Sequence, residues 1–251
     1  MATVLSKMYG ELAGYWPLIS PAGNYVKEAA IWRDVLRRRL GPGRHSIFEL
    51  GVGGGCNLSH LTSEFDAVAA DISPQMIEQA RKLNPGVEFH VGDMRTIRLG
   101  RTFKAVLIHD AISYMLSEDE LRAAFATAAA HLEPGGVFVT LPDWFRETFQ
   151  GPIVSHRTHT RGDVRFTYFE YIHDPDPADT TIEALYWYLI QEGGKLRVEE
   201  DRHTLGLFPM ETWVSLIEEA GFDVEKVPYD VEGGHGAPLF LGVLGLPVGR
   251  P

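Results

Sequence analysis

The sequence contains a single cysteine, Cys56, among its 251 residues. One thiol excludes an internal disulfide framework and is typical of a reducing compartment, so we expect a cytoplasmic protein. No apolar run approaches the roughly 20 residues that span a bilayer, and the N-terminus shows no signal-peptide pattern. Internal repeats and low-complexity tracts are also lacking. These absences favour a globular protein without a membrane partner.

Basic residues are scarce. Lys and Arg number 23 against 34 Asp and Glu, which gives a net charge of −11. A nucleic-acid partner therefore has no general electrostatic support, and we expect none. The one basic cluster, Arg37 to Arg39 with Arg44, closes a predicted helix over residues 25–40, where cations are favourable. A hydrophobic content of 45% fits one globular domain over residues 1–251.

The most informative stretch is residues 46–56, where an apolar strand pattern over 46–50 enters a glycine-rich loop. The loop reads Glu49-x-Gly51-x-Gly53-x-Gly55, and a helical pattern is predicted from Asn57. A strand, a glycine loop and a helix bring backbone N–H groups close to a nucleotide-like ligand. The dinucleotide fingerprint needs a third glycine where Cys56 stands. A carboxylate beside the loop suits a cationic ligand better than a phosphate.

Two further predicted strands end in acidic residues. Residues 67–71 end at Asp71, twenty residues beyond Gly51, where a carboxylate can bind ribose hydroxyls. Ser73-Pro74 then starts a helix, so Asp71 could instead only cap that helix. Residues 87–92 form the next predicted strand, and Asp93-Met94 follow it. An acceptor and an apolar side chain at this position suit a purine.

The remaining pattern alternates strands and helices. A strand over 105–108 ends at His109-Asp110, a capping box at Ser117-x-x-Glu120 opens a helix through Leu132, and a turn over 133–136 precedes a strand over 137–141. A helix over 209–220 and strands over 222–229 and 239–244, joined through a mobile-looking loop at 233–236, complete the chain. We predict an α/β, Rossmann-like fold.

Residues 142–208 interrupt this alternation and predict an inserted antiparallel sheet. Strands are expected over 165–173, 181–190 and 195–207, with a turn at 174–177 and a hairpin at Gly193-Gly194. The turn lacks the glycine and terminal glutamate of a calcium loop, and no metal site is expected. The aromatic side chains of the insertion either line a substrate cavity or form its own core or a dimer contact: Phe166, Tyr168, Phe169, Tyr171, Tyr186, Trp187 and Tyr188. Residues 1–24, also aromatic, are either a cap over a cofactor or a surface segment.

The glycine loop, Asp71 and Gly92-Asp93-Met94 together resemble the class I S-adenosylmethionine (SAM)-dependent methyltransferases. The resemblance implies a seven-stranded, mostly parallel sheet with helices on both faces and a reversed hairpin at its end. A narrower similarity exists to bacterial amino-sugar N,N-dimethyltransferases, in Tyr15, in Asn24-Tyr25-x-x-Glu28-Ala29 and in His203-Thr204-Leu205-x-Leu207-Phe208. It implies methyl transfer from SAM to a nitrogen or oxygen atom of a small molecule, with S-adenosylhomocysteine as product.

The resemblance also implies the site residues. Those expected to bind the cofactor are Tyr15, Glu49, Gly51, Gly53, Gly55, Asp71, Ile72, Met76, Asp93, Met94 and His109, with Asp93 on the adenine amino group and Met94 on the ring. Those expected near the substrate are Asp110, Tyr114, Asp143, Trp144 and Tyr168. An SN2 displacement depends mainly on positioning, and a general base is optional. The candidate bases are His109, favoured by its strand-end position, and His156, His159, His203 and His235.

Two other functions stay open at this point. An NAD-dependent oxidoreductase is disfavoured by Cys56 at the third glycine position and by Asp93-Met94. A non-catalytic module that binds SAM or its product would lack a cavity beside the cofactor. A homodimer is possible, and the pattern does not identify the methyl acceptor.

Overall fold

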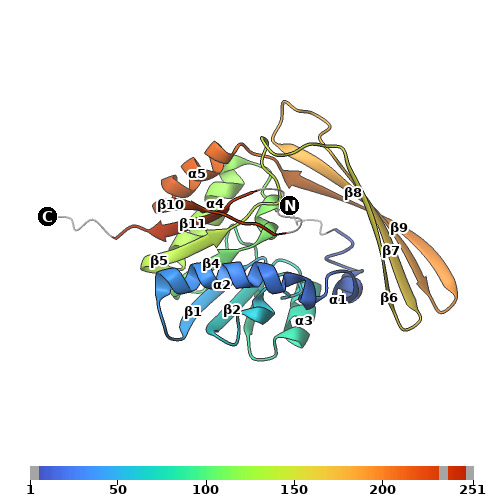
Figure 1. Cartoon of the computed structure of the whole chain (residues 1–251), viewed down its shortest axis with the longest axis horizontal. Helices are drawn as coiled ribbons and strands as arrows, with labels where there is room; N and C mark the ends of the chain where they lie inside the picture. Colours follow the sequence, from blue (N-terminus) through green and yellow to red (C-terminus); the bar gives the residue numbers. More distant parts are fainter. Residues whose placement is uncertain (1–5, 232–236, 247–251) are drawn as a thin grey trace.

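The computed structural model describes residues 6–231 and 237–246 and contains two sheets (Figure 1). The larger has seven strands in the order β10-β11-β5-β4-β1-β2-β3. Its strands are β1 (His45–Leu50), β2 (Phe65–Asp71), β3 (Glu88–Val91), β4 (Phe103–Ile108), β5 (Leu132–Thr140), β10 (Phe222–Val227) and β11 (Leu239–Leu244). The predicted loop at 233–236, with His235, lies outside the described residues.

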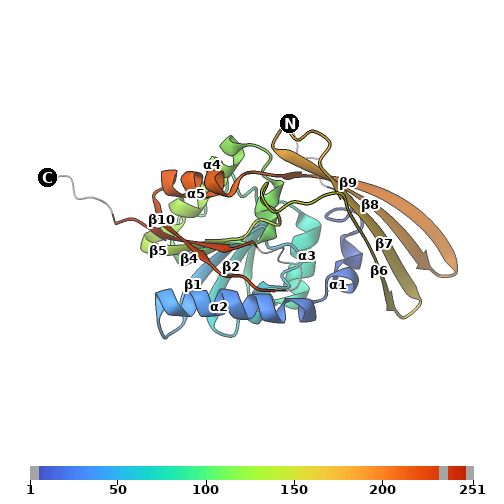
Figure 2. The ribbon, with the colours of Figure 1, turned by 45° about the horizontal axis from the view of Figure 1, so that its top comes forward.

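The first five strands are parallel, and β11 runs antiparallel to both β5 and β10. Helix α2 (Val26–Leu40) covers one face, and α4 (Glu118–Ala130) and α5 (Met210–Glu219) cover the other (Figure 2). Helix α3 (Pro74–Leu83) packs on β2 and β3. The predicted Rossmann-like sheet, its helices on both faces and its reversed terminal hairpin are therefore confirmed.

The central strands are buried on both faces, which explains why they read as unbroken apolar runs rather than as alternating patterns. Residues 105–108 of β4 are fully buried, as are Ile47 and Phe48 of β1. Ser73 caps α3 by accepting a hydrogen bond from the N–H of Met76 at 3.0 Å, and Ser117 caps α4 through the N–H of Glu120 at 3.3 Å. Both predicted helix starts are confirmed.

The helix predicted from Asn57 is wrong. The structure has only a 3₁₀ turn, Leu58–His60, before β2 begins at Phe65. Two hydroxyls in this segment bond to nearby carbonyls: Ser59 to that of Cys56 at 2.7 Å and Thr62 to that of Ser59 at 3.3 Å. Such local bonds compete with regular helix, and the segment is too short to recover it.

The boundary between α4 and β5 also differs from the prediction. The helix ends at Ala130, and β5 begins at Leu132 rather than at Val137. Phe103 pairs with Leu132 and Ala105 pairs with Val137, so the residues predicted as a separate turn form a bulge inside β5. Gly135, with φ of +76°, supplies the backbone conformation that this bulge needs.

The insertion forms a separate antiparallel sheet in the order β6-β7-β8-β9, which extends from the body of the molecule (Figure 1). Its strands are β6 (Ile153–Arg161), β7 (Val164–His173), β8 (Thr181–Glu192) and β9 (Lys195–Gly206). The sequence prediction missed β6, because this edge strand is largely exposed and carries His, Arg and Thr side chains in place of an apolar alternation.

The inserted sheet has two different faces. Side chains paired directly across strands share a face, so Phe166, Tyr168, Tyr186 and Tyr188 lie on the inner face, toward the N-terminal segment. The outer face carries Phe169, Tyr171 and Trp187. Phe166 and Tyr188 therefore belong to a buried core, one of the alternatives that the sequence left open, and a substrate-binding role for the other rings stays a prediction.

The N-terminal segment is more regular than expected. It forms the 3₁₀ turns Ala13–Tyr15 and Ala22–Tyr25 and one turn of helix, α1 (Trp16–Ile19). Met8, Leu12 and Leu18 pack against Phe166 and Tyr188 of the inserted sheet. The segment therefore fills the angle between the two sheets.

Candidate active site

The order of the sheet reverses between β1 and β4, and the polar side chains gather beyond the carboxyl ends of these strands and of β2. Ligands of open α/β sheets bind at such a switch point. Glu49, Asp71 and His109, at these strand ends, are all buried, although each side chain is polar. The predicted glycine loop and strand-end acids thus lie at one edge of the sheet.

The glycine loop bends tightly after β1. Gly51 has a φ of +71°, and a Cβ there would lie 2.4 Å from the Cβ of Ala111 and 2.9 Å from the Cε of Met94. A side chain at this position is therefore excluded on both conformational and steric grounds. The N–H of Gly53 donates to Asp71 at 2.8 Å, so the loop is bonded directly to the end of β2. Met76 lies beside Gly53, 3.7 Å from the position of a Cβ there.

Glu49 is a buried carboxyl group with an unsatisfied oxygen. Its side chain is 2% exposed, and Oε2 has no hydrogen-bond partner among the described residues. Burial raises the pKa of Glu49 to about 8, and the nearby His109 charge opposes this shift only in part. An unpaired buried acid needs a cation, and the ammonium group of SAM supplies one. This orphaned oxygen shows that the residues present fit SAM.

Asp71 joins the glycine loop to the start of α3. Besides the bond from Gly53, it accepts the N–H of Ser73 at 2.8 Å. Burial raises its pKa, and these backbone bonds limit the rise. Each carboxylate oxygen keeps a second lone pair for a ribose hydroxyl. The capping role and the proposed ribose role are therefore compatible.

We expect Asp71→Ala to weaken SAM binding by roughly 1.5–3 kcal/mol, about 10- to 150-fold in Kd, because charge-assisted hydrogen bonds to ribose are lost. Calorimetric titration with SAM measures this change. Ser73→Ala is the control, because it removes the cap of the same helix but leaves the carboxylate. Equal affinity of wild type and Asp71→Ala would show that this acid is only structural.

The predicted adenine side of the site contains an ion pair that the sequence did not reveal. Arg95 binds Asp93 through Nε, at 3.0 Å from both carboxylate oxygens, and through Nη2 at 2.6 Å. Partial burial favours a raised pKa, but the bonds from Arg95 hold the pKa of Asp93 below its usual value. Arg95 also binds Glu120 of α4. Asp93 is thus a fixed, ionised acceptor, and Met94 lies between it and Gly51.

His109 is held between two carboxylates. Its Nε2 lies 3.0 Å from Glu28, and its Nδ1 lies 3.2 Å from Asp110. Burial alone lowers a histidine pKa, but the charge and hydrogen bonds of Asp110 and Glu28 hold this pKa well above the ordinary value. A protonated ring that donates from both nitrogens has no lone pair for a substrate proton. The geometry favours a positioning role for His109 over the predicted general base.

Asp110 and Asp143 form an acidic pair near this histidine. The surrounding protein acts to raise the pKa of Asp110, but the charge and hydrogen bond of His109 lower it. Asp143 follows β5, and its N–H donates to Ser113 Oγ at 3.0 Å. Burial and the Asp110 charge raise the pKa of Asp143 to about 7. A carboxylate with this pKa can exchange a proton near neutral pH.

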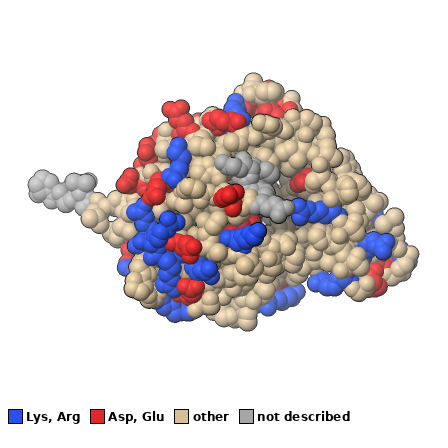
Figure 3. Space-filling view, viewed as in Figure 1, with Lys and Arg blue, Asp and Glu red and all other residues tan. Residues whose placement is uncertain are grey.

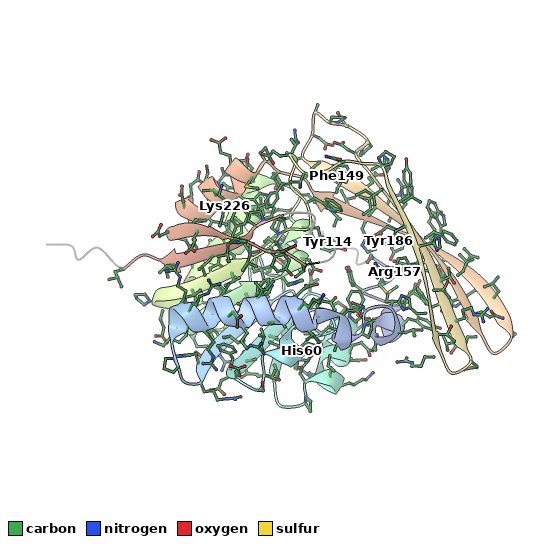
Figure 4. All side chains as sticks on the ribbon, viewed as in Figure 1. His60, Tyr114, Phe149, Arg157, Tyr186 and Lys226 are labelled. Atoms are coloured by element: carbon green, nitrogen blue, oxygen red, sulfur yellow. The ribbon has the colours of Figure 1, made fainter. Side chains whose placement is uncertain are left out.

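A chain of hydrogen bonds links the site to the inserted sheet. The Tyr114 hydroxyl lies 3.0 Å from that of Tyr9 and 2.7 Å from Nδ1 of His203, whose Nε2 lies 3.1 Å from Asp201. Asp201 also accepts the backbone N–H groups of Lys7 and Met8, at 3.0 and 2.9 Å. These bonds fix Tyr9 and Tyr114 in place, and Figure 4 shows Tyr114 close to Tyr186 of the inserted sheet.

Several predicted residues are not brought to this cluster. The Tyr15 hydroxyl donates to Glu192 at 2.7 Å, and its ring packs on Phe166, which places it on the inserted sheet. Trp144 is packed beneath that sheet with Ile172 and Leu205. Of the other predicted residues, Ile72 is half-buried after β2, Tyr168 lies farther along the inner face, and Gly55 packs on α3 beside Ala80 and Asn84.

The candidate histidines also separate. His156 lies on the outer face against Phe169, and His159 stacks on Tyr168. Besides His109, which belongs to the cluster, His203 contacts it through Tyr114.

Sequence reasoning missed three residues of the site. Trp16 lies against the glycine loop, since a Cβ on Gly54 would be 2.3 Å from its ring. Tyr9 contacts Tyr114, and Glu28 of α2 binds His109. All three precede the glycine loop; Glu28 belongs to the segment Asn24-Tyr25-x-x-Glu28-Ala29 of the narrower resemblance, but no site role was assigned to any of the three. The aromatic content of residues 1–24 was the available signal.

No helix within residues 6–231 or 237–246 is long and apolar enough to cross a membrane.

Comparison with known proteins agrees with this geometry. Residues 47–136 match a family described as a methyltransferase domain. The chain is 36% identical over 223 residues to a Streptomyces venezuelae dTDP-3-amino-3,4,6-trideoxy-alpha-D-glucopyranose N,N-dimethyltransferase. The alignment covers 88% of this chain and 91% of the relative. The sugar N-methyltransferase KedS8 from Streptoalloteichus has a TM-score of 0.84 at 27% identity, covering 98% and 96% of the two chains.

A second similar structure was determined with SAM bound. It is CalS10, an amino pentose methyltransferase from Micromonospora echinaspora, with a TM-score of 0.77 at 26% identity over 97% of this chain and 99% of that one. A Rossmann-like sheet with this glycine loop and these acids defines an S-adenosylmethionine-binding enzyme fold. The chain belongs to the class I SAM-dependent methyltransferases. It is an enzyme with SAM as cofactor, which confirms the predicted function and excludes the oxidoreductase and the non-catalytic module.

Proposed function

We propose that this enzyme methylates the amino group of a nucleotide-linked amino sugar, adding two methyl groups in turn. The observation that carries the proposal is the pair Asp110 and Asp143, whose charges both act to raise the pKa of Tyr9. Asp143 is influenced electrostatically by Asp110 and Glu170, so three acids face the same region. Such a region favours a protonated amine. Two of the similar enzymes described above are named for amino-sugar substrates.

In this proposal, separate residues bind the cofactor, accept a proton from the amine and orient the sugar. SAM, when bound, supplies an electrophilic methyl group on a sulfonium sulfur. Glu49, Asp71 and Asp93 would hold the ammonium, ribose and adenine groups of the cofactor. Asp143 would accept the proton that the amine must lose before its nitrogen can attack. Tyr9 and Tyr114 would orient the sugar, because their hydroxyls are fixed by His203, and fixed geometry is the main source of acceleration.

The test is a methylation assay with dTDP-3-amino-3,4,6-trideoxyglucose, followed by mass spectrometry. We expect a monomethyl intermediate that is converted to a dimethyl product. An analogue with a hydroxyl in place of the amine is the control, because a hydroxyl carries no positive charge for the acidic pair to bind. Methylation of the hydroxyl analogue alone would contradict the proposal.

The outer face of the inserted sheet supports a second proposal, that the enzyme is a homodimer. This face exposes large apolar side chains: Val154 is 71%, Phe169 42%, Leu196 63% and Val198 59% exposed. Exposed apolar patches of this kind are typical of protein interfaces. The face also carries both Arg202 and Glu200, so a two-fold related copy can place opposite charges in contact.

We expect Phe169→Glu to convert a dimer to a monomer, because a charge would be buried at the centre of the contact. Light scattering after gel filtration measures the change. Val26→Glu is the matched control. Val26 is 54% exposed but belongs to helix α2, which covers the seven-stranded sheet and not the inserted sheet. A wild-type monomer at micromolar concentration would contradict the homodimer.

A further inference from the structure

The indole N–H of Trp16 is a buried donor beside the glycine loop. Trp16 opens α1, and its Cδ1 and Nε1 would lie 2.3 and 2.4 Å from a Cβ on Gly54. Nε1 is buried and has no hydrogen-bond partner among the described residues. A buried N–H that stays unpaired costs free energy. A ligand that accepts a hydrogen bond from this atom would therefore gain affinity.

The thiol of Cys56 lies close to this N–H but is a poor acceptor. Burial raises the pKa of the thiol to about 11, and the Trp16 N–H opposes this rise. The thiol donates its proton to the carbonyl oxygen of Ser20 at 3.2 Å. Because a neutral sulfur accepts hydrogen bonds only weakly, it does not satisfy the indole. The indole N–H remains available to a stronger acceptor.

Trp16 and Glu49 both act on this thiol. The charge of Glu49 affects Cys56, as the indole N–H does. Glu49 Oε2 is the orphaned oxygen that fits the ammonium of SAM. In SAM this ammonium and a carboxylate are attached to one carbon atom, so binding of the ammonium fixes the carboxylate close by. An unpaired carboxyl group and an unpaired N–H near one thiol match such a zwitterionic ligand.

Few other donors are free at this place. The backbone N–H groups of the loop are mostly bonded within the protein: those of Gly51, Val52, Gly53 and Gly55. The N–H of Gly54, beside Trp16, forms no hydrogen bond within residues 6–231 and 237–246. His109 is a cation, but both of its ring nitrogens bind carboxylates. The four residues of α1 carry no charge, and the surface where α1 lies is mostly uncharged (Figure 3). Trp16 and Gly54 are therefore the donors that remain for a carboxylate.

We propose that Trp16 Nε1, with the N–H of Gly54, donates a hydrogen bond to the methionyl carboxylate of SAM while Glu49 binds the ammonium. The charges of Asp71 and Asp110 also act on Glu49, so this region is acidic. A lysine or arginine in the place of Trp16 would pair with these acids and compete with the ammonium for Glu49. A neutral N–H binds the carboxylate without that competition. The inference concerns the cofactor and does not depend on the proposed amino-sugar substrate.

The test compares SAM with decarboxylated SAM, which keeps the ammonium, the sulfonium and the adenosine. Trp16→Phe preserves an aromatic ring over Gly54 but removes the N–H. We expect this variant to raise the Kd for SAM roughly 10- to 150-fold in calorimetric titration, because a hydrogen bond to a charged group is lost. Its Kd for decarboxylated SAM should equal that of wild type. Trp187→Phe, a half-buried indole on the outer face of the inserted sheet, is the matched control and should bind both compounds as wild type does.

A second measurement uses the wild-type protein alone, so it does not depend on how the variant folds. In NMR spectra of protein with 15N-labelled tryptophan, the Trp16 N–H resonance is identified by its contact with the ring of Tyr9, whose centroid lies 5.8 Å away. It should move downfield with S-adenosylhomocysteine but not with methylthioadenosine, which lacks the amino-acid group. The same movement with both compounds would overturn the inference. So would an equal loss of affinity for SAM and decarboxylated SAM in Trp16→Phe, or no loss for SAM.

Discussion

Glu49→Gln should make the cofactor-free enzyme more stable and the cofactor weaker in binding. Its carboxyl is buried, and the pKa is raised from 4.5 to about 8. An unfolded chain ionises this acid above about pH 4.5, while the folded chain keeps its proton until about pH 8. Between these two pH values the free energy of unfolding falls as pH rises. By neutral pH the loss relative to pH 4.5 amounts to roughly 3 kcal/mol. Glutamine does not ionise and removes this penalty.

Thermal unfolding without ligand measures the stabilisation, which we expect to be several degrees at pH 7 and smaller at pH 5. With saturating SAM, wild type should instead have the higher melting temperature, because the ammonium of SAM pairs with the carboxylate of Glu49 but not with glutamine. We expect Kd for SAM to rise roughly 10- to 100-fold in Glu49→Gln. Glu133→Gln, at a half-buried position near the start of β5, is the control. Equal SAM affinity in Glu49→Gln would refute the role of this acid in cofactor binding.

Asp143→Asn should have the largest effect on catalysis. If Asp143 accepts the amine proton, its loss lowers kcat/KM by roughly 100-fold or more, while SAM affinity is retained. The pKa of about 7 gives a second signature. Only the ionised carboxylate can accept a proton, so kcat/KM of wild type should fall about tenfold per pH unit below pH 7. Asn has no such group, and this acidic limb should disappear.

Asp163→Asn is the matched control for Asp143→Asn, because Asp163 lies in the exposed turn between β6 and β7. It should leave both rate and pH profile unchanged. A full pH profile from pH 5 to 9 with the amino-sugar substrate distinguishes a proton acceptor from a structural residue. An unchanged acidic limb in Asp143→Asn would refute the assignment, whatever the loss in rate.

The sequence predicted the parts of the site that depend on local chemistry. Glu49, Asp71 and Met94 could be predicted because a glycine loop and the residues at strand ends are read directly along the chain, and parallel strands must present those ends at one edge. The alternation of strands and helices was predicted from the same pattern, whereas the seven-stranded sheet and its reversed hairpin were implied by the resemblance. The homologous fold then confirmed the class of enzyme.

Contacts between distant segments could not be predicted in this way. Nothing near His109 in the sequence indicates Glu28, which lies 81 positions earlier and holds the ring from α2. Glu28 and His109 were each named in the family resemblance, but the contact between them was not. Similarly, β6 has no apolar alternation, because an exposed edge strand needs none. Tyr15 resembled a cofactor residue, whereas the structure directs it to Glu192.

The contact between Asp201 and the backbone of Lys7 has a consequence for biosynthesis. These residues are 194 positions apart, so a segment that is synthesised early is held by a strand that is synthesised much later. Contacts of such long range form late in folding, because closing the long intervening loop costs conformational entropy before the contact can stabilise the fold. We expect chains that end before β9 to lack the ordered contacts of Tyr9 with Tyr114 and of Trp16 with the glycine loop. Tight SAM affinity should therefore appear only in chains that include β9.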